Sequence, residues 1–135
     1  MSCHSRPTKR EIDKRLKEAR QALQNGQVAF ANEAKIIGEI MALEIGETNE
    51  IWALILDMIE ELELDDYDGH HPPQKSYEPA IADCELWAFT WNSALLKKVM
   101  YLKFAIKEGC FYYVSLHKSK FSKEEKNEML EMQQR

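Results

Sequence analysis

Four side chains in the C-terminal third of the chain suit acid–base and phosphate chemistry. They are Tyr101, Lys103, His117 and Lys118. Histidine ordinarily exchanges its proton near neutral pH and can act as a general base or acid. Lysine can bind a phosphate, and tyrosine can donate a hydrogen bond or stack on a base. Such groups could cleave RNA through its own 2′-hydroxyl, a reaction that requires no cofactor and no metal.

Two neighbouring apolar segments are expected to position these side chains. Residues 99–106 and 111–118 are rich in Val, Ile, Phe and Tyr, and a short stretch containing Gly109 separates them. This pattern is typical of a β-hairpin. Because alternate side chains of a strand share a face, Tyr101, Lys103 and Ala105 are expected on the same side of the sheet.

Three further lysines flank the hairpin and are predicted to contact RNA: Lys97, Lys98 and Lys120. Each of the two central residues also has a purely structural interpretation. His117 could be a surface histidine that ends a strand, and Tyr101 could be a tyrosine that only packs across strands. A non-catalytic interaction module therefore stays open as a second hypothesis. Convergence of these lysines, Lys103 and Lys118 with His117 on one groove would favour the nuclease, and lysines that point apart would count against it on geometry.

The length of 135 residues predicts a single domain over residues 1–135, with a core over about 8–121. The three cysteines have no C-x-x-C spacing, which argues against a zinc site or a disulfide framework. Neither an apolar run long enough for a membrane span nor an apolar leader segment is present. We therefore expect a cytoplasmic protein without a membrane partner. The cysteines are Cys3, Cys84 and Cys110.

Charge is strongly segregated along the chain, although the net charge is only −5. Residues 25–92 hold 15 acidic and two basic residues, whereas the segments before and after them each carry a net charge of +4. A nucleic acid responds to the local potential rather than to net charge. Solvated helix faces are an equally good interpretation of this pattern.

Three helices are predicted in the N-terminal half. Residues 8–25 begin with the capping-box spacing of Thr8 and Glu11 and carry Ile, Leu and Ala at helical spacing. After a short strand over 27–30, a second helix follows Asn32, and a largely apolar third helix runs from about residue 49 to 62.

A long loop and a further strand are predicted next. Residues 65–83 include His70-His71-Pro72-Pro73, and the prolines exclude a helix there. The two histidines lack helical i, i+4 spacing, so a metal site is disfavoured. Residues 85–91 alternate as a strand and complete a three-stranded antiparallel meander. Residues 122–135 are expected to form a terminal helix or tail.

Over residues 14–121 the chain resembles the motility quorum-sensing regulator (MqsR) family of type II toxins. The resemblance implies an α+β, RelE-like domain whose N-terminal helices pack on a small antiparallel sheet. It further implies an mRNA interferase with a cognate antitoxin partner, and it allows a homodimer. The matching segments are Asn25-Gly26-Gln27-Val28, Ala42-Leu43-Glu44-Ile45-Gly46, 55–62 with Asp66-Tyr67, Leu86-Trp87, Tyr101-Leu102-Lys103 and Val114-Ser115-Leu116.

The family's site residues correspond only in part. Its strand tyrosine falls on Tyr101, and its lysine after the last strand falls on His117, with Lys118 next to it. The expected glutamine after the strand tryptophan is Ala88, and an expected lysine falls on Asp68, which reverses the charge. A toxin homologue that has lost cleavage is therefore a third hypothesis.

Overall fold

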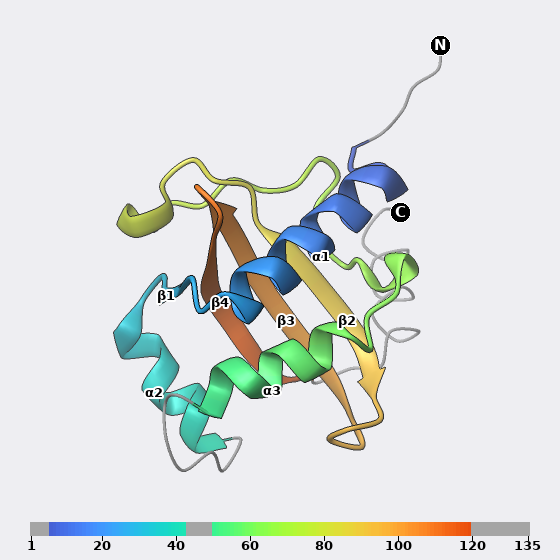
Figure 1. The fold of residues 1–135 in the computed structure, drawn as a ribbon, viewed down its shortest axis with the longest axis vertical. Helices are drawn as coiled ribbons and strands as arrows, with labels where there is room; N and C mark the ends of the chain where they lie inside the picture. The colour runs from blue at the N-terminus through green and yellow to red at the C-terminus, as the bar shows by residue number, and fades with distance from the viewer. Residues whose placement is uncertain (1–5, 43–49, 120–135) are drawn as a thin grey trace, which may run out of the picture.

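The computed structural model describes residues 6–42 and 50–119, which form three α-helices and a four-stranded sheet (Figure 1). This confirms the predicted α+β class. The predicted terminal helix over 122–135 lies outside the described residues. None of the described helices is long and apolar enough to cross a membrane. The elements are α1 (Lys9–Gln24), β1 (Val28–Phe30), α2 (Glu33–Ala42), α3 (Glu50–Ile59), β2 (Trp87–Ser93), β3 (Lys98–Lys107) and β4 (Cys110–Lys118).

The sheet has the strand order β1-β4-β3-β2. Strands β2, β3 and β4 form the predicted antiparallel meander, and the predicted N-terminal strand is present as β1. However, β1 pairs with β4 in the parallel direction, so the sheet is mixed and the expectation of a purely antiparallel sheet was wrong. A tight turn forces two strands to be antiparallel, but β1 and β4 are far apart in the chain and are free of that constraint.

Helix α1 begins and ends where the sequence predicts. Thr8 accepts a hydrogen bond from the Glu11 amide, and the Glu11 carboxylate accepts one from the Thr8 amide, which completes the capping box. Asn25 caps the other end, and Gly26 follows with φ +71°, a conformation that glycine adopts without strain.

One face of the sheet is covered by α1 and α3 (Figure 1). The buried apolar faces of the two helices pack there against side chains of β2, β3 and β4. This packing forms the main core, which is apolar on both sides of the interface. The sheet contributes Trp87, Phe89, Trp91, Met100, Leu102, Phe104, Phe111, Tyr113 and Leu116.

Strand β4 contains a β-bulge at Val114. Tyr113 pairs with Phe104 and Ser115 pairs with Lys103, so Val114 has no opposite residue on β3. A bulge reverses the alternation of the strand beyond it. Consequently Leu116 is buried in the main core beside Tyr113, and His117 lies on the opposite face of the sheet.

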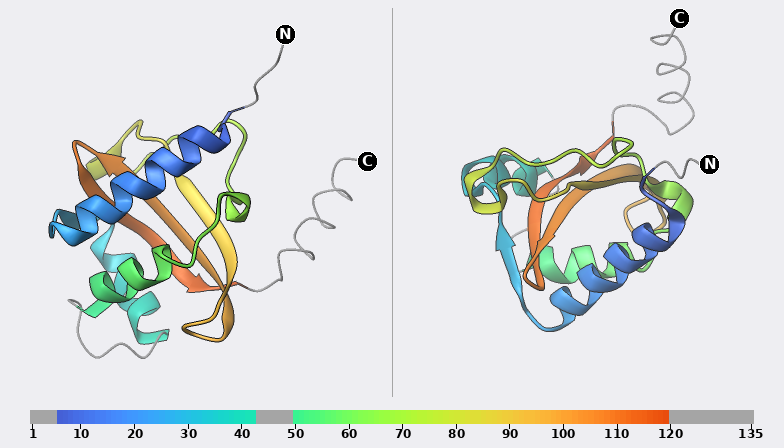
Figure 2. Two further views of the ribbon diagram at one scale, coloured as in Figure 1. Left: turned by 45° about the vertical axis from the view of Figure 1, so that its right-hand side comes forward. Right: turned by 90° about the horizontal axis from the view of Figure 1, so that it is seen from above.

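The opposite face of the sheet is covered mainly by the segment 67–86, which includes the short 3₁₀ helix Pro79–Ile81, and α2 packs against β4 (Figure 2). The long loop predicted over 65–83 is held in place by isolated bridges of Tyr67 with Phe89 and of Lys75 with Glu85. Ile81 lies buried against Ala105 and Val114 in a small second core. The loop therefore covers this face only in part.

Glu61, just after α3, holds the turn between β2 and β3. Its carboxylate accepts hydrogen bonds from the Trp91 indole, the Ser93 hydroxyl and the amides of Ala94 and Leu95, at 2.7–3.1 Å. Burial alone would raise the pKa of Glu61, but the hydrogen bonds from the turn outweigh burial and lower this pKa below its ordinary value.

Replacing Glu61 should therefore destabilise the protein in a pH-dependent way. Glu61→Ala should lower the free energy of unfolding by about 2 kcal/mol at neutral pH, because four donors lose a charged acceptor. Since the pKa is lowered on folding, this stabilisation should be lost as the pH falls below the ordinary value of 4.5. Urea unfolding at pH 7 and pH 3.5 would measure both effects. The control is Glu60→Ala, which removes only a surface ion pair with Arg20, and equal losses in the two variants would contradict the prediction.

Candidate functional site

Tyr101 and His117 form the centre of the candidate site. They are directly opposite each other on β3 and β4, and their rings stack with centroids 5.1 Å apart and an interplanar angle of 27°. Tyr101 is partly buried, which raises its pKa to about 12, and the nearby Asp68 carboxylate contributes to this rise. Tyr101 therefore stays protonated at neutral pH and serves as a hydrogen-bond donor.

Lys103 lies two residues further along β3 on the same face, as predicted. Its ammonium nitrogen is 5.9 Å from the centroid of the Tyr101 ring, in a cation–π arrangement. Burial lowers the pKa of Lys103, the neighbouring Lys35 lowers it further, and Glu39 partly opposes both. A partly buried cation with a lowered pKa is suited to binding a phosphate and to giving up a proton.

The ring orientation of His117 leaves one nitrogen available for catalysis. His117 is exposed, and its Nδ1 lies 3.0 Å from the backbone carbonyl oxygen of Lys118. A carbonyl can only accept, so in the neutral ring Nδ1 carries the proton and donates it to this oxygen. The Nε2 atom then has the lone pair that a general base requires.

Glu39 of α2 holds the bulge that turns His117 toward Tyr101. Its carboxylate accepts hydrogen bonds from the Tyr113 hydroxyl at 2.6 Å, the Ser115 hydroxyl at 2.8 Å and the Leu116 amide at 3.2 Å. These donors lie on both sides of Val114. Burial and the Glu39 carboxylate together raise the pKa of Tyr113 above its ordinary value. One carboxylate thus fixes β4 where its alternation reverses.

Asp68 and Ala88, where the chain departs from the MqsR pattern, lie against each other beside Tyr101. The Asp68 amide donates to the Ala88 carbonyl at 2.8 Å, and the Asp68 carboxylate accepts from the Thr90 hydroxyl at 2.7 Å. Both residues line a small hollow of about 100 Å³. The other residues that line it are Gly69, His70, Gln74, Leu86, Tyr101 and Lys103.

The remaining predicted lysines do not join this group. Lys118 is opposite Met100, whose side chain is in the helix-side core, so Lys118 lies on the face away from His117. Lys98 shares that face by alternation, and Lys97 is exposed in the β2–β3 turn with φ 56°. Lys120 is outside the described residues. The structure therefore brings Tyr101, Lys103 and His117 together. The expected convergence of the lysines on one groove with His117 is not observed for Lys97, Lys98 and Lys118.

Two residues near Lys103 were missed because they reach the site only through tertiary contacts. Lys35, from α2, is close enough to Lys103 to affect its pKa, and Gln74 comes from the long loop. The composition of the 65–83 loop was the only sequence signal for this contribution. No three His, Cys, Asp or Glu side chains within the described residues gather closely enough to hold a metal ion.

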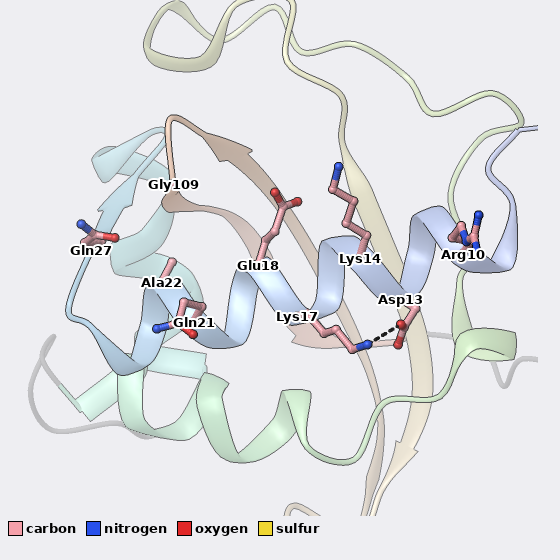
Figure 3. Close-up of a pocket in the computed structure, with 9 residues that line it drawn as sticks. All are labelled: Arg10, Asp13, Lys14, Lys17, Glu18, Gln21, Ala22, Gln27 and Gly109. Atoms are coloured by element: carbon pink, nitrogen blue, oxygen red, sulfur yellow. Dashed lines mark ion pairs between the residues drawn. The ribbon is translucent and has the colours of Figure 1, made fainter.

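A different hollow, of about 470 Å³, lies along the outer side of α1 (Figure 3). Its lining mixes both signs of charge, and Lys17 forms an ion pair with Asp13 at 2.9 Å. The lining contains no histidine, tyrosine or cysteine. We therefore place the candidate site on the opposite face of the sheet, around Tyr101.

No protein family, curated protein or solved structure matches this chain. The site is therefore interpreted from its own geometry and from the resemblance described above.

The proximity of Lys35 and Lys103 can be tested by an NMR titration of the lysine side chains. The pKa of Lys103 should lie below the ordinary 10.5 and should rise in Lys35→Ala, because removing a neighbouring positive charge favours the protonated form. Lys75→Ala should leave the pKa of Lys103 unchanged. The Lys103 side-chain resonance would be assigned from its loss in Lys103→Arg. An unaltered pKa in Lys35→Ala would refute the electrostatic coupling.

The role of Glu39 predicts a loss of stability together with a local change at the site. Glu39→Ala should lower the free energy of unfolding by about 3 kcal/mol, because three donors, all on buried residues, lose one charged acceptor. It should also shift the His117 ring resonances, because the bulge loses its anchor. Glu33→Ala, in the first turn of the same helix, is the control and should cost under about 1 kcal/mol. Unchanged His117 resonances in Glu39→Ala would disprove the anchoring role.

Proposed function

We propose that this protein is a metal-independent endoribonuclease with a RelE-like fold, acting as the toxin of a type II toxin–antitoxin pair. One observation carries the proposal. The positions that the MqsR resemblance assigns to the site come from four separate segments, yet three of them line one hollow and the fourth contacts a residue of its lining. Asp68, Ala88 and Tyr101 line it, and His117 stacks on Tyr101.

The proposed reaction is transesterification at an RNA phosphate. The Nε2 atom of His117 takes the proton from the 2′-hydroxyl, and the 2′-oxygen attacks the phosphorus. Lys103 balances the negative charge of the phosphorane and donates a proton to the leaving 5′-oxygen, while the Tyr101 hydroxyl donates a hydrogen bond to a phosphate oxygen. The products are a 2′,3′-cyclic phosphate and a 5′-hydroxyl.

The proposed substrate is single-stranded RNA, and in the cell this substrate would be messenger RNA. His117 is exposed and its ring stacks on Tyr101, and an exposed aromatic pair of this kind accepts an unpaired base. In the cytoplasm the cognate antitoxin would inhibit this activity until the antitoxin itself is removed.

A second candidate is a homologue that has kept the fold but lost cleavage. Asp68 favours it, because its carboxylate introduces a negative charge beside Tyr101 where the MqsR pattern has a lysine. Ala88 favours it as well, because it removes the polar side chain of the glutamine expected there. In this case the protein would bind a protein partner without degrading RNA.

The proposal is tested with purified protein and a single-stranded RNA oligonucleotide in buffer containing EDTA. We expect fragments that end in 2′,3′-cyclic phosphate, and no cleavage at a position carrying a 2′-deoxy sugar. His117→Ala should slow cleavage by a factor of about 10² to 10⁴, the range for loss of a general acid or base. Tyr101→Phe and Lys103→Ala should also slow it.

The matched control is Lys118→Ala, which removes a charge next to His117 but on the other face of the sheet. It should change the cleavage rate by less than about threefold, and thermal unfolding should show that all variants are folded. Intact RNA after incubation with the folded wild-type protein would reject the nuclease and favour the cleavage-deficient homologue.

A further inference from the structure

A second hollow adjoins the candidate site on the same face of the sheet. It has a volume of about 350 Å³ and shares Gln74, Leu86 and Lys103 with the small hollow beside Tyr101. The two hollows therefore adjoin, and together they are called the groove. The rest of its lining comes from α2, from the loop before β2 and from β4, namely Lys35, Lys75, Ser76, Tyr77, Glu78 and Val114.

The groove is positively charged although it is built mainly from the acidic part of the chain. Residues 25–92 contain only two basic residues, Lys35 and Lys75, and both line this hollow. Lys103 adds a third positive charge, so the groove has three lysines against two carboxylates, those of Glu78 and Asp68. Across residues 6–42 and 50–119, no Asp or Glu forms an ion pair with any of the three lysines.

The positive charges of Lys35 and Lys103 repel each other. Lys35 is close enough to Lys103 to disfavour its protonated form, and the nearby Glu39 carboxylate, which also accepts hydrogen bonds from β4, opposes this only in part. Clustered cations that face a hollow attract an anion, because a bound anion relieves their repulsion. Phosphate groups of a nucleic acid are anions of this kind.

Tyr77 provides an aromatic surface at the rim. Its side chain is 92% exposed, which is unusual for a large aromatic residue. The loop around it is nonetheless fixed by neighbouring Ser76, which is buried and whose hydroxyl accepts from the Glu78 amide at 3.0 Å. The Ser76 amide also donates to the Cys84 carbonyl at 2.8 Å. Tyr77 is thus an exposed ring on an anchored loop.

We propose that the groove formed by Lys35, Lys75, Tyr77 and Lys103 binds the stretch of single-stranded RNA next to the cleaved phosphate. This inference rests on the proposed nuclease function and identifies a second nucleotide subsite for it. The lysines contact consecutive phosphates, and one base stacks on Tyr77 as another stacks near Tyr101. An acidic peptide would satisfy the lysines but would not use two separate aromatic rings, so RNA is the better fit.

The test measures binding, independently of cleavage. A fluorescent single-stranded RNA of about ten nucleotides, made uncleavable by 2′-deoxy substitution, is titrated with the protein at several salt concentrations. The double variant Lys35→Ala/Lys75→Ala should weaken binding by about tenfold or more at low salt. It should also reduce the slope of log K against log salt by about 1.4, because each phosphate contact to a single strand contributes about 0.7.

The matched control is Arg10→Ala/Lys14→Ala, which removes the same charge from the outer side of α1 (Figure 3). It should leave the affinity within about twofold of the wild type. Tyr77→Ala should weaken binding by about tenfold with an unchanged salt slope. Tyr77→Phe keeps the aromatic ring and should bind RNA as tightly as the wild type. All substituted side chains are exposed, so the variants should fold.

The outcomes separate this inference from the proposed function. If the groove and control variants lose affinity equally, or if the wild type binds an acidic peptide but not RNA, the subsite is refuted. If binding depends on the groove but the wild-type protein leaves cleavable RNA intact, the subsite stands and the nuclease fails. Cleavage that proceeds normally in a groove variant whose RNA affinity is unchanged would reject the subsite alone.

Discussion

The bulge at Val114 is the constraint on which the candidate site depends. With strict alternation through β4, the side chains of Ser115 and His117 would follow Tyr113 into the helix-side core, and Leu116 would face solvent. The bulge reverses this arrangement at the cost of one unpaired residue. Leu116 is thereby buried and His117 stacks on Tyr101. Glu39 stabilises the reversal from outside the sheet, so α2 contributes to the site without entering its centre.

The two faces of the sheet have different coverings, and this difference creates the site. Helices α1 and α3 bury one face almost completely, because their apolar residues match the apolar side chains of the strands. The loop over the other face buries only a small cluster around Ile81. The incomplete cover leaves Tyr101, Lys103 and the groove beside them accessible. The fold also changes how charge is distributed compared with the sequence. Lys35 and Lys75 belong to the acidic segment 25–92, but in the structure they line the same hollow as Lys103.

The two departures from the MqsR pattern are a contacting pair in the structure. Asp68 and Ala88 are joined by a backbone hydrogen bond, and Asp68 further binds Thr90. A change at one position therefore alters the surroundings of the other, and both border Tyr101. The local chemistry differs from the pattern at one connected place rather than at scattered positions.

The sequence by itself determined the features that depend on near neighbours. The capping box of α1, its Asn25-Gly26 end and the meander of β2, β3 and β4 follow from local hydrogen bonding and alternation. The shared face of Tyr101 and Lys103 follows from the same alternation. Only the tertiary structure decided the parallel direction of β1, the bulge, and the approach of Lys35, Asp68 and Gln74 to the site. It also separated Lys118 from His117. These features arise from packing between segments far apart in the chain, which no local pattern encodes.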